Sequence, residues 1–167
     1  GFVESMTNPD DNTTNYLYNG QKLEYVIYPD LTPGTLGDNP RKQYLYEKTE
    51  PGFEHLLTGL IDEENIRFAT WDYNEVGQAI YSEHSGGAEK MIITRNLDGT
   101  ITTENALGKQ TTYHYESIKG FLKITDVEGH QSNNCNATWQ STTYNPETGF
   151  AHEKTDWRGN KVVLEHN

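Results

Sequence analysis

The fold is decided by residues 59–129, which read GLIDEENIRFATWDYNEVGQAIYSEHSGGAEKMIITRNLDGTITTENALGKQTTYHYESIKGFLKITDVEG. This stretch is a succession of turn clusters, all but the first of which end in Gly. The glycines at 77, 87, 99, 108, 120 and 129 are 10, 12, 9, 12 and 9 residues apart. Two successive gaps make a period of about 21 residues, which is typical of one β-hairpin per repeat. Glycine suits these positions because tight hairpin turns require a positive φ, which residues with a Cβ resist.

Segments of strand length lie between the turns, and no helical period is sustained anywhere. The predicted strands cover a hairpin at 15–28 that turns at Asn19-Gly20, then 43–48, 67–73, 78–83, 90–95, 100–103, 110–116, 121–125, 139–144, 151–155 and 161–165. Residues 53–61 fit either a short helical turn or a strand. Proline and glycine make residues 29–40 a long loop. We therefore predict an all-β array of successive antiparallel hairpins in one extended, twisted sheet, with residues 1–14 as a loop or frayed end and residues 15–167 as a single array.

Composition excludes several classes of function. The formal net charge is -12, which argues against nucleic acid and anionic membrane surfaces as partners. Only 33% of the residues are hydrophobic, yet the chain has 11 Tyr, 3 Trp and 5 Phe, which favours a thin sheet over disorder. The single cysteine, Cys135, allows no internal disulfide. No apolar run has the length of a membrane span, the first residues do not form a signal peptide, and we interpret the chain as a fragment of a longer one.

Acidic residues recur at the turns, where their carboxylates could in principle serve a glycosidase or a calcium site. A structural role explains them better, because Asp and Asn side chains bond their own backbone in turns. We therefore predict no catalytic, cofactor-binding or metal-binding residue, and assign a repeat-turn signature to Asp72, Tyr73, Gly77, Asp98, Gly99, Gly108, Gly129, Gly149, Asp156 and Gly159.

Of three weaker patterns, the first two receive structural interpretations and the third is only a match to a motif. His130 and Cys135 are the closest pair for zinc, but two ligands make no site, so we interpret His130 as a turn residue and Cys135 as a buried hydrophobe. Gly86-Gly87 follows Ser82-Glu83-His84-Ser85 without phosphate-loop spacing and is predicted to be a loop. The segments 12–14 and 136–138 match the N-glycosylation pattern.

Several segments resemble the YD repeats of Rhs proteins. The repeat-like clusters are Asp72–Ile80, Asn105–Tyr113 and Asp156–Asn160. The segments Tyr44-Leu45-Tyr46-Glu47, Leu56-Leu57-Thr58-Gly59, Asp62-Glu63, Arg67-Phe68-Ala69-Thr70-Trp71 and Ser82-Glu83-His84 are similar to the core region of bacterial Rhs proteins. The chain departs from the usual pattern at Gln78, where Arg is usual, and at Asn65, where Gly is usual. Asn65 must then adopt the left-handed conformation, for which Asn is the next best residue.

The resemblance implies a role as well as a fold. In Rhs proteins many hairpins join edge to edge into a sheet that spirals into a hollow shell around a toxic C-terminal domain of the same chain. The expected partners are therefore flanking repeats and that toxin domain, and the expected location is secreted or at the cell surface. The hallmark of self-cleavage is not seen in this chain. Two open sheet edges predict that the chain by itself dimerises or associates end to end.

The aromatic residues support an alternative role. Other YD-repeat proteins are cell-surface proteins suggested to bind carbohydrate, and rings on a solvent-exposed sheet face could stack on sugars. The candidates for stacking are Trp71, Tyr113, Tyr115 and Trp139. The competing interpretation is that these rings form cross-strand pairs that stabilise a thin sheet.

Overall fold

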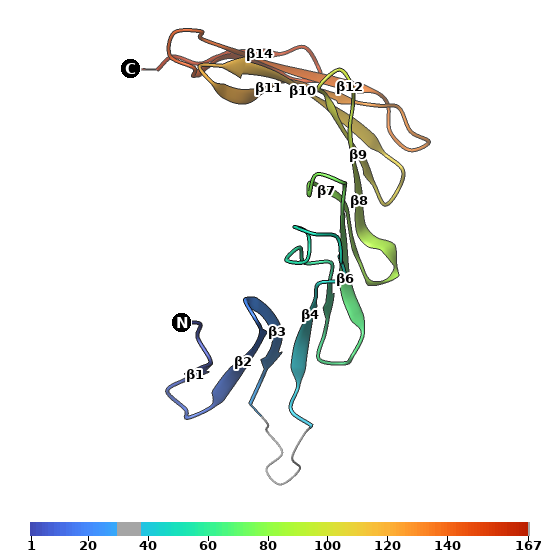
Figure 1. Ribbon diagram of the computed structural model, residues 1–167. Helices are drawn as coiled ribbons and strands as arrows, with labels where there is room; N and C mark the ends of the chain where they lie inside the picture. The colour runs from blue at the N-terminus through green and yellow to red at the C-terminus, as the bar shows by residue number, and fades with distance from the viewer. Residues whose placement is uncertain (30–37, 167) are drawn as a thin grey trace. The chain divides into compact units, whose positions relative to one another are not determined.

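The structure, a computed structural model, describes residues 1–29 and 38–166. Within these described residues, fourteen strands follow one another in sequence order in one open antiparallel sheet, which confirms the predicted all-β fold of successive hairpins (Figure 1). The strands are β1 (Ser5–Thr7), β2 (Thr13–Asn19), β3 (Lys22–Ile27), β4 (Arg41–Leu45), β5 (Gly59–Ile61), β6 (Arg67–Tyr73), β7 (Ala79–His84), β8 (Ala88–Arg95), β9 (Ile101–Asn105), β10 (Gln110–Ile118), β11 (Phe121–Gly129), β12 (Thr138–Tyr144), β13 (Ala151–Thr155) and β14 (Lys161–Val163).

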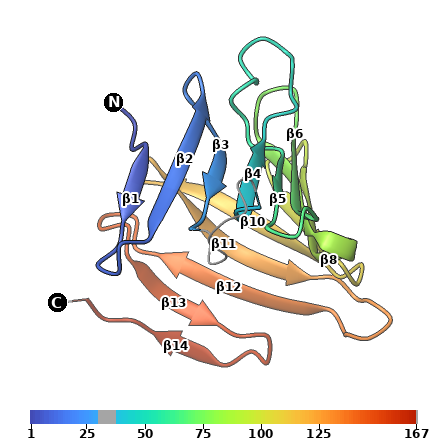
Figure 2. The ribbon, with the colours of Figure 1, turned by 90° about the horizontal axis from the view of Figure 1, so that it is seen from below.

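Two compact units divide the chain, residues 1–88 and residues 89–167. In the second unit, β10 and β11 are nine residues each and pair from Thr111–Gly129 to Ile118–Phe121. Thr125 is an extra, bulged residue of β11, opposite the step from His114 to Tyr115 in β10. Strands β11 to β14 lie side by side in chain order in Figure 2. Most of the predicted loop at 29–40 lies outside the described residues.

The N-terminal segment differs from the prediction. Residues 1–14 were expected to be a loop or frayed end, but Ser5–Thr7 forms strand β1 and pairs with Thr13–Asn15. The turn between them is built by Asn8, whose Oδ1 accepts the backbone N–H groups of Asp10 and Asn12 at 3.0 and 2.9 Å. Asp11 supplies the positive φ, 60°, that Gly supplies in other turns. The hairpin was missed because its turn contains no glycine.

One turn design recurs along the chain. In the turn after β9, the Asn105 N–H donates to Lys109 O and the Gly108 N–H donates to Asn105 O. Asn105 Oδ1 also accepts the N–H groups of Leu107 and Lys109, each at 3.0 Å, and Gly108 has a φ of 73°. The same four hydrogen bonds recur in the turns that begin at Asn8, Asp62, Asn74 and Asp156, where Asp11, Asn65, Gly77 and Gly159 have positive φ. The repeat is thus set by an Asx residue followed three residues later by a left-handed one.

Three residues of the predicted turn signature lie in strands instead. Asp72 and Tyr73 belong to β6, and Asn74 is the first residue of the turn that follows. Gly129 ends β11 without a positive φ. A Cβ on Gly129 would collide with Thr138 Oγ1, so close approach of the neighbouring strand, rather than a turn, explains this glycine. The hairpin at 15–28 is confirmed, but its two-residue loop is Gly20-Gln21 because Asn19 pairs with Lys22.

Almost no second layer of structure packs on the sheet. Among the described residues only two hydrophobic side chains are buried, Val26 and Ala69, and both belong to the first unit. The solvent-accessible surface of the chain is 12000 Å². A compact monomer of 19.0 kDa would expose roughly 8,400 Å². Stability must therefore come from strand pairing, turns and cross-strand side-chain contacts more than from a core.

Candidate functional site

The connection between β4 and β5 breaks the hairpin pattern. It spans residues 46–58, whereas the neighbouring turns after β2 and β6 are short. Two successive turns, closed by hydrogen bonds from Phe53 N–H to Glu50 O and from Leu56 N–H to Phe53 O, fold it back on the sheet. Long connections inside regular sheets are the usual place for functional groups, so this segment is the candidate site of the first unit.

An ion pair anchors the start of this connection. Arg67 on β6 donates from Nη1 and Nη2 to the two carboxylate oxygens of Glu47, at 3.0 and 2.8 Å. The same guanidinium donates to Thr58 O at 3.0 Å and from Nε to Thr70 Oγ1 at 3.0 Å. Glu47 also accepts a hydrogen bond from the Thr58 hydroxyl at 2.8 Å. The hydrogen bonds from Arg67 and then from Thr58 lower the pKa of Glu47 to about 2.

A second set of contacts holds the connection against the end of β6. Lys48 Nζ lies 2.6 Å from Asp72 Oδ1, and this hydrogen bond is the main cause that lowers the pKa of Asp72 and raises that of Lys48. The Tyr73 hydroxyl donates to Leu57 O at 2.8 Å. Asp72 and Tyr73 thus join two elements, which is a different role from the turn signature predicted for them.

A small cavity of about 220 Å³ lies between the connection and the turn after β6. Apolar, polar and charged residues line it together: Lys48, Glu50, Phe53, Leu56, Tyr73, Asn74 and Glu75. The Phe53 ring packs on the turn so closely that a Cβ on Gly77 would lie 3.2 Å from it. None of these lining residues is among the four predicted sugar-stacking residues. The one usable signal was the Pro51-Gly52 break, which marks an irregular segment.

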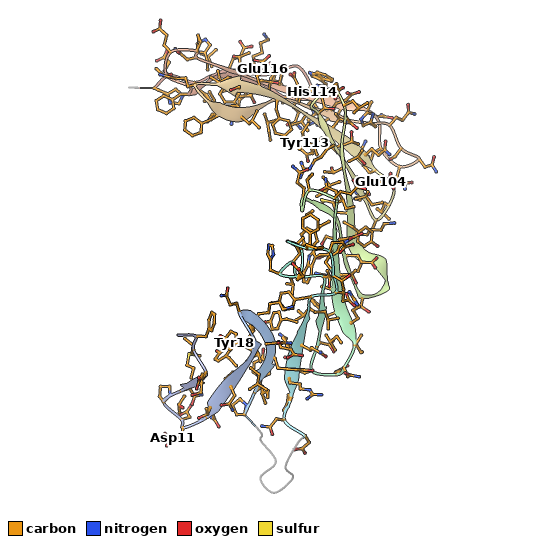
Figure 3. The ribbon with its side chains drawn as sticks, in the orientation of Figure 1. Asp11, Tyr18, Glu104, Tyr113, His114 and Glu116 are labelled. Atoms are coloured by element: carbon orange, nitrogen blue, oxygen red, sulfur yellow. The ribbon has the colours of Figure 1, made fainter. Side chains whose placement is uncertain are left out.

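The four predicted stacking residues do not form one platform. Trp71 belongs to β6 of the first unit. Tyr113 and Tyr115 share one face of β10, and the strand register places Trp139 on the opposite face. There Trp139, 49% exposed, packs against His114 with ring centroids 5.5 Å apart. Figure 3 labels Tyr113 and His114, neighbours in sequence that point to opposite faces of the strand.

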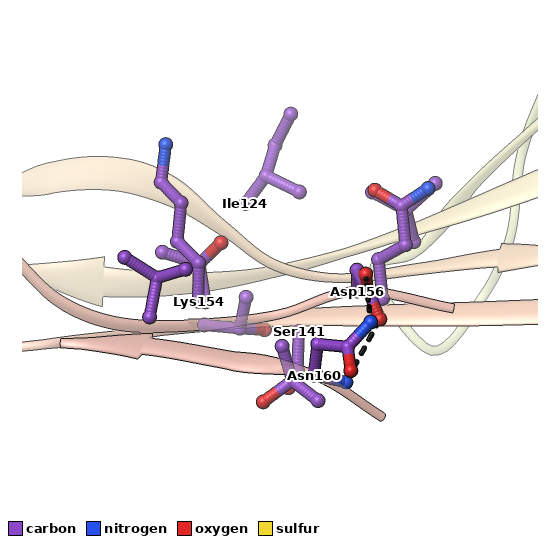
Figure 4. Close-up of a pocket in the computed structure, with 11 residues that line it drawn as sticks. Ile124, Ser141, Lys154, Asp156 and Asn160 are labelled. Atoms are coloured by element: carbon purple, nitrogen blue, oxygen red, sulfur yellow. Dashed lines mark hydrogen bonds between the residues drawn. The ribbon is translucent and has the colours of Figure 1, made fainter. Parts of the chain in front are cut away.

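A second cavity, of about 320 Å³, lies in the second unit on β11, β12 and β13 (Figure 4). Ile124 lies on one wall and Lys154 on another, while Asp156 and Asn160 close one end. Asn160 Nδ2 donates to Asp156 Oδ2 at 2.9 Å, and this bond is the main cause of the lowered pKa of Asp156. Asp156 therefore stabilises the turn that begins at this residue.

One histidine of the second unit, His130, joins a row of hydrogen-bonded threonines across the sheet. His130 Nε2 lies 2.8 Å from Thr112 Oγ1, which in turn lies 2.9 Å from Thr102 Oγ1.

The interpretation of Cys135 as a buried hydrophobe is wrong, because its thiol lies on an exposed loop. Over the described parts of the chain, no group of three or more His, Cys, Asp or Glu side chains is placed to hold a metal ion.

No family model matches the chain, and no curated protein matches it. The resemblance to Rhs proteins therefore rests on the motifs in the sequence. Within residues 1–29 and 38–166, no helix has the length and apolar character needed to cross a membrane.

Proposed function

We propose that this chain is a non-catalytic structural segment of a longer hairpin-repeat sheet, of the kind that Rhs proteins build into a shell around a C-terminal toxin domain of the same polypeptide. Its work is mechanical. Hairpins add to one another through backbone hydrogen bonds, and the resulting wall keeps a cargo away from bulk water and proteases. The segment is secreted or lies at the cell surface, in line with that resemblance.

The observation that carries the proposal is the near-absence of a core. A free-standing domain of this size normally buries many large side chains. Here the described hydrophobic residues reach full burial only at Val26 and Ala69, and Leu97, Leu107, Leu122 and Val76 are at least 70% exposed. Such a sheet fits a part that gains further contacts from flanking repeats.

The contacts around the β4–β5 connection add support. Three of the segments that resemble the Rhs core region, residues 44–47, 56–59 and 67–71, are far apart in sequence. One residue from each of these segments belongs to a single hydrogen-bonded cluster. The three residues are Glu47, Thr58 and Arg67. The resembling residues thus include those that fix the long, irregular connection between β4 and β5.

The size of the native gene product tests this proposal. An antibody raised against residues 1–167 is used to probe extracts and culture medium of the source cells. We expect a band several times larger than 19.0 kDa, because the shell needs many more repeats. A native product of about this mass would overturn the proposal.

The second candidate function, carbohydrate binding, is favoured by Trp139 alone. Its indole is half exposed on a sheet face and is backed by His114, an arrangement that leaves one ring surface for a sugar. Binding of a glycan should change the tryptophan fluorescence of the wild type and leave that of W139A unchanged. A full glycan array without any fluorescence response would remove this candidate.

A further inference from the structure

The cavity beside the β4–β5 connection has the composition of a site for an organic cation. Two aromatic rings, Phe53 and Tyr73, and the side chain of Leu56 form its apolar part. Glu50 and Glu75, two exposed acidic residues, also line it. Aromatic faces attract cations through their quadrupole, and the alkyl stem of a long cationic side chain packs well on such surfaces.

The cavity also has the right net charge. Its only basic residue, Lys48, is already engaged, since its ammonium lies 2.6 Å from Asp72 and donates to Tyr73 O at 3.4 Å. Glu50 Oε2 accepts the Thr49 N–H at 3.1 Å, and the charge of Glu50 contributes to the raised pKa of Lys48. Neither Glu50 nor Glu75 forms a salt bridge within the described residues. Residues 1–88 carry 15 acidic and 5 basic residues, against 10 and 8 in residues 89–167. The surrounding field therefore favours a positive ligand in this unit far more than in the other.

The walls are held in place before any ligand arrives. The Lys48–Asp72 pair and the Tyr73–Leu57 hydrogen bond fix the connection to β6, and Phe53 is packed against Gly77. A volume of about 220 Å³ accommodates one long side chain and is too small for an oligosaccharide or a folded element.

We propose that this cavity binds a lysine or arginine side chain presented by a peptide segment of another protein. The aliphatic stem lies on Phe53, Tyr73 and Leu56, and the cationic head lies between Glu50 and Glu75. The β4–β5 connection is then a recognition element. Binding of the cationic side chain does not depend on whether the sheet is part of a shell.

Aromatic-ring NMR tests the site directly. Protein labelled with ¹³C in its Phe and Tyr rings is titrated with Nα-acetyl-lysine amide, and separately with Nα-acetyl-norleucine amide, which has the same stem without the ammonium. We expect saturable millimolar shifts of the Phe53 and Tyr73 ring signals with the lysine compound only. Equal responses to both compounds, or none to the lysine compound, would overturn the proposal.

Neutral isosteres identify the groups that hold the cation. The double variant E50Q/E75Q should weaken binding of the lysine compound about threefold or more, as expected for the loss of two exposed charge pairs. The control E64Q removes an exposed carboxylate of the same unit, on the turn after β5, and should leave binding within twofold. An equal effect of E64Q would mean that the response reports general charge attraction and not this cavity.

Discussion

The guanidinium of Arg67 lies directly against the α-carbon of Gly59, so that a Cβ on Gly59 would lie 2.6 Å from Nη2. Gly59 has no positive φ, so the glycine is required by this approach and not by backbone conformation. Arg67 cannot simply move aside, because Glu47, Thr58 and Thr70 hold its guanidinium.

This contact predicts a coupled pair of substitutions. G59A should destabilise the first unit by about 1–3 kcal/mol, because it breaks the hydrogen bonds of a charged group. In an R67A background the same change should cost nothing or stabilise slightly, since alanine suits a strand interior better than glycine. Urea denaturation of the four proteins measures the coupling. Additive effects would show that the two residues do not interact.

The sign of the pH dependence follows from the lowered pKa of Glu47. A carboxyl with a pKa of about 2 in the folded state and 4.5 in the unfolded state stabilises the fold above pH 4.5. That contribution is lost as the pH falls from 4.5 to 2. The Glu47 side chain is 52% exposed, so solvent screening reduces the contribution to about 1 kcal/mol. The stability difference between wild type and E47Q, measured by denaturation from pH 7 to pH 2, should shrink over that interval. A constant difference would contradict the assignment.

The recurring turn can be tested at Asn105. N105A removes the two hydrogen bonds that Oδ1 accepts from Leu107 and Lys109, and should cost about 1–2 kcal/mol. N105D should be close to neutral, because Asp62 and Asp156 accept the same bonds in equivalent turns. Thermal unfolding of the two variants compares them directly, and equal destabilisation would mean that the side-chain acceptor is unimportant.

Most of the sheet was predictable because its turns carry local signals. Gly77, Gly99, Gly108, Gly149 and Gly159 all have positive φ, as the turn requires. The local rule also explains Asn65, which was identified from sequence as a left-handed residue and has a φ of 60°. An Asx residue with a left-handed residue three or four positions later marks a turn. One strand ends before this turn and the next begins after it.

The candidate site was less predictable because it depends on contacts between distant residues. Glu47 and Arg67 are 20 positions apart in the sequence. Phe53, which precedes β5, packs against Gly77, which follows β6. Gly129 shows the same limit, since the sequence marks a glycine but not whether a turn or a neighbouring side chain requires it. Periodicity gives strands and turns, and it does not reveal how an irregular connection packs against them.

The free edge of β14 gives the last prediction. In the β13–β14 pair, Leu164 N–H donates to His152 O, and the register pairs Lys154 with Val162. The N–H of Val162 therefore points inward and that of Val163 points to the open edge. If the chain associates through its edges, V163P should reduce self-association without unfolding, since proline is tolerated where the N–H faces outward. V162P is the matched control and should lose strand β14. Sedimentation velocity at high protein concentration measures association, and circular dichroism monitors folding. A wild type that stays monomeric, or a V163P that associates as before, would contradict association through this edge.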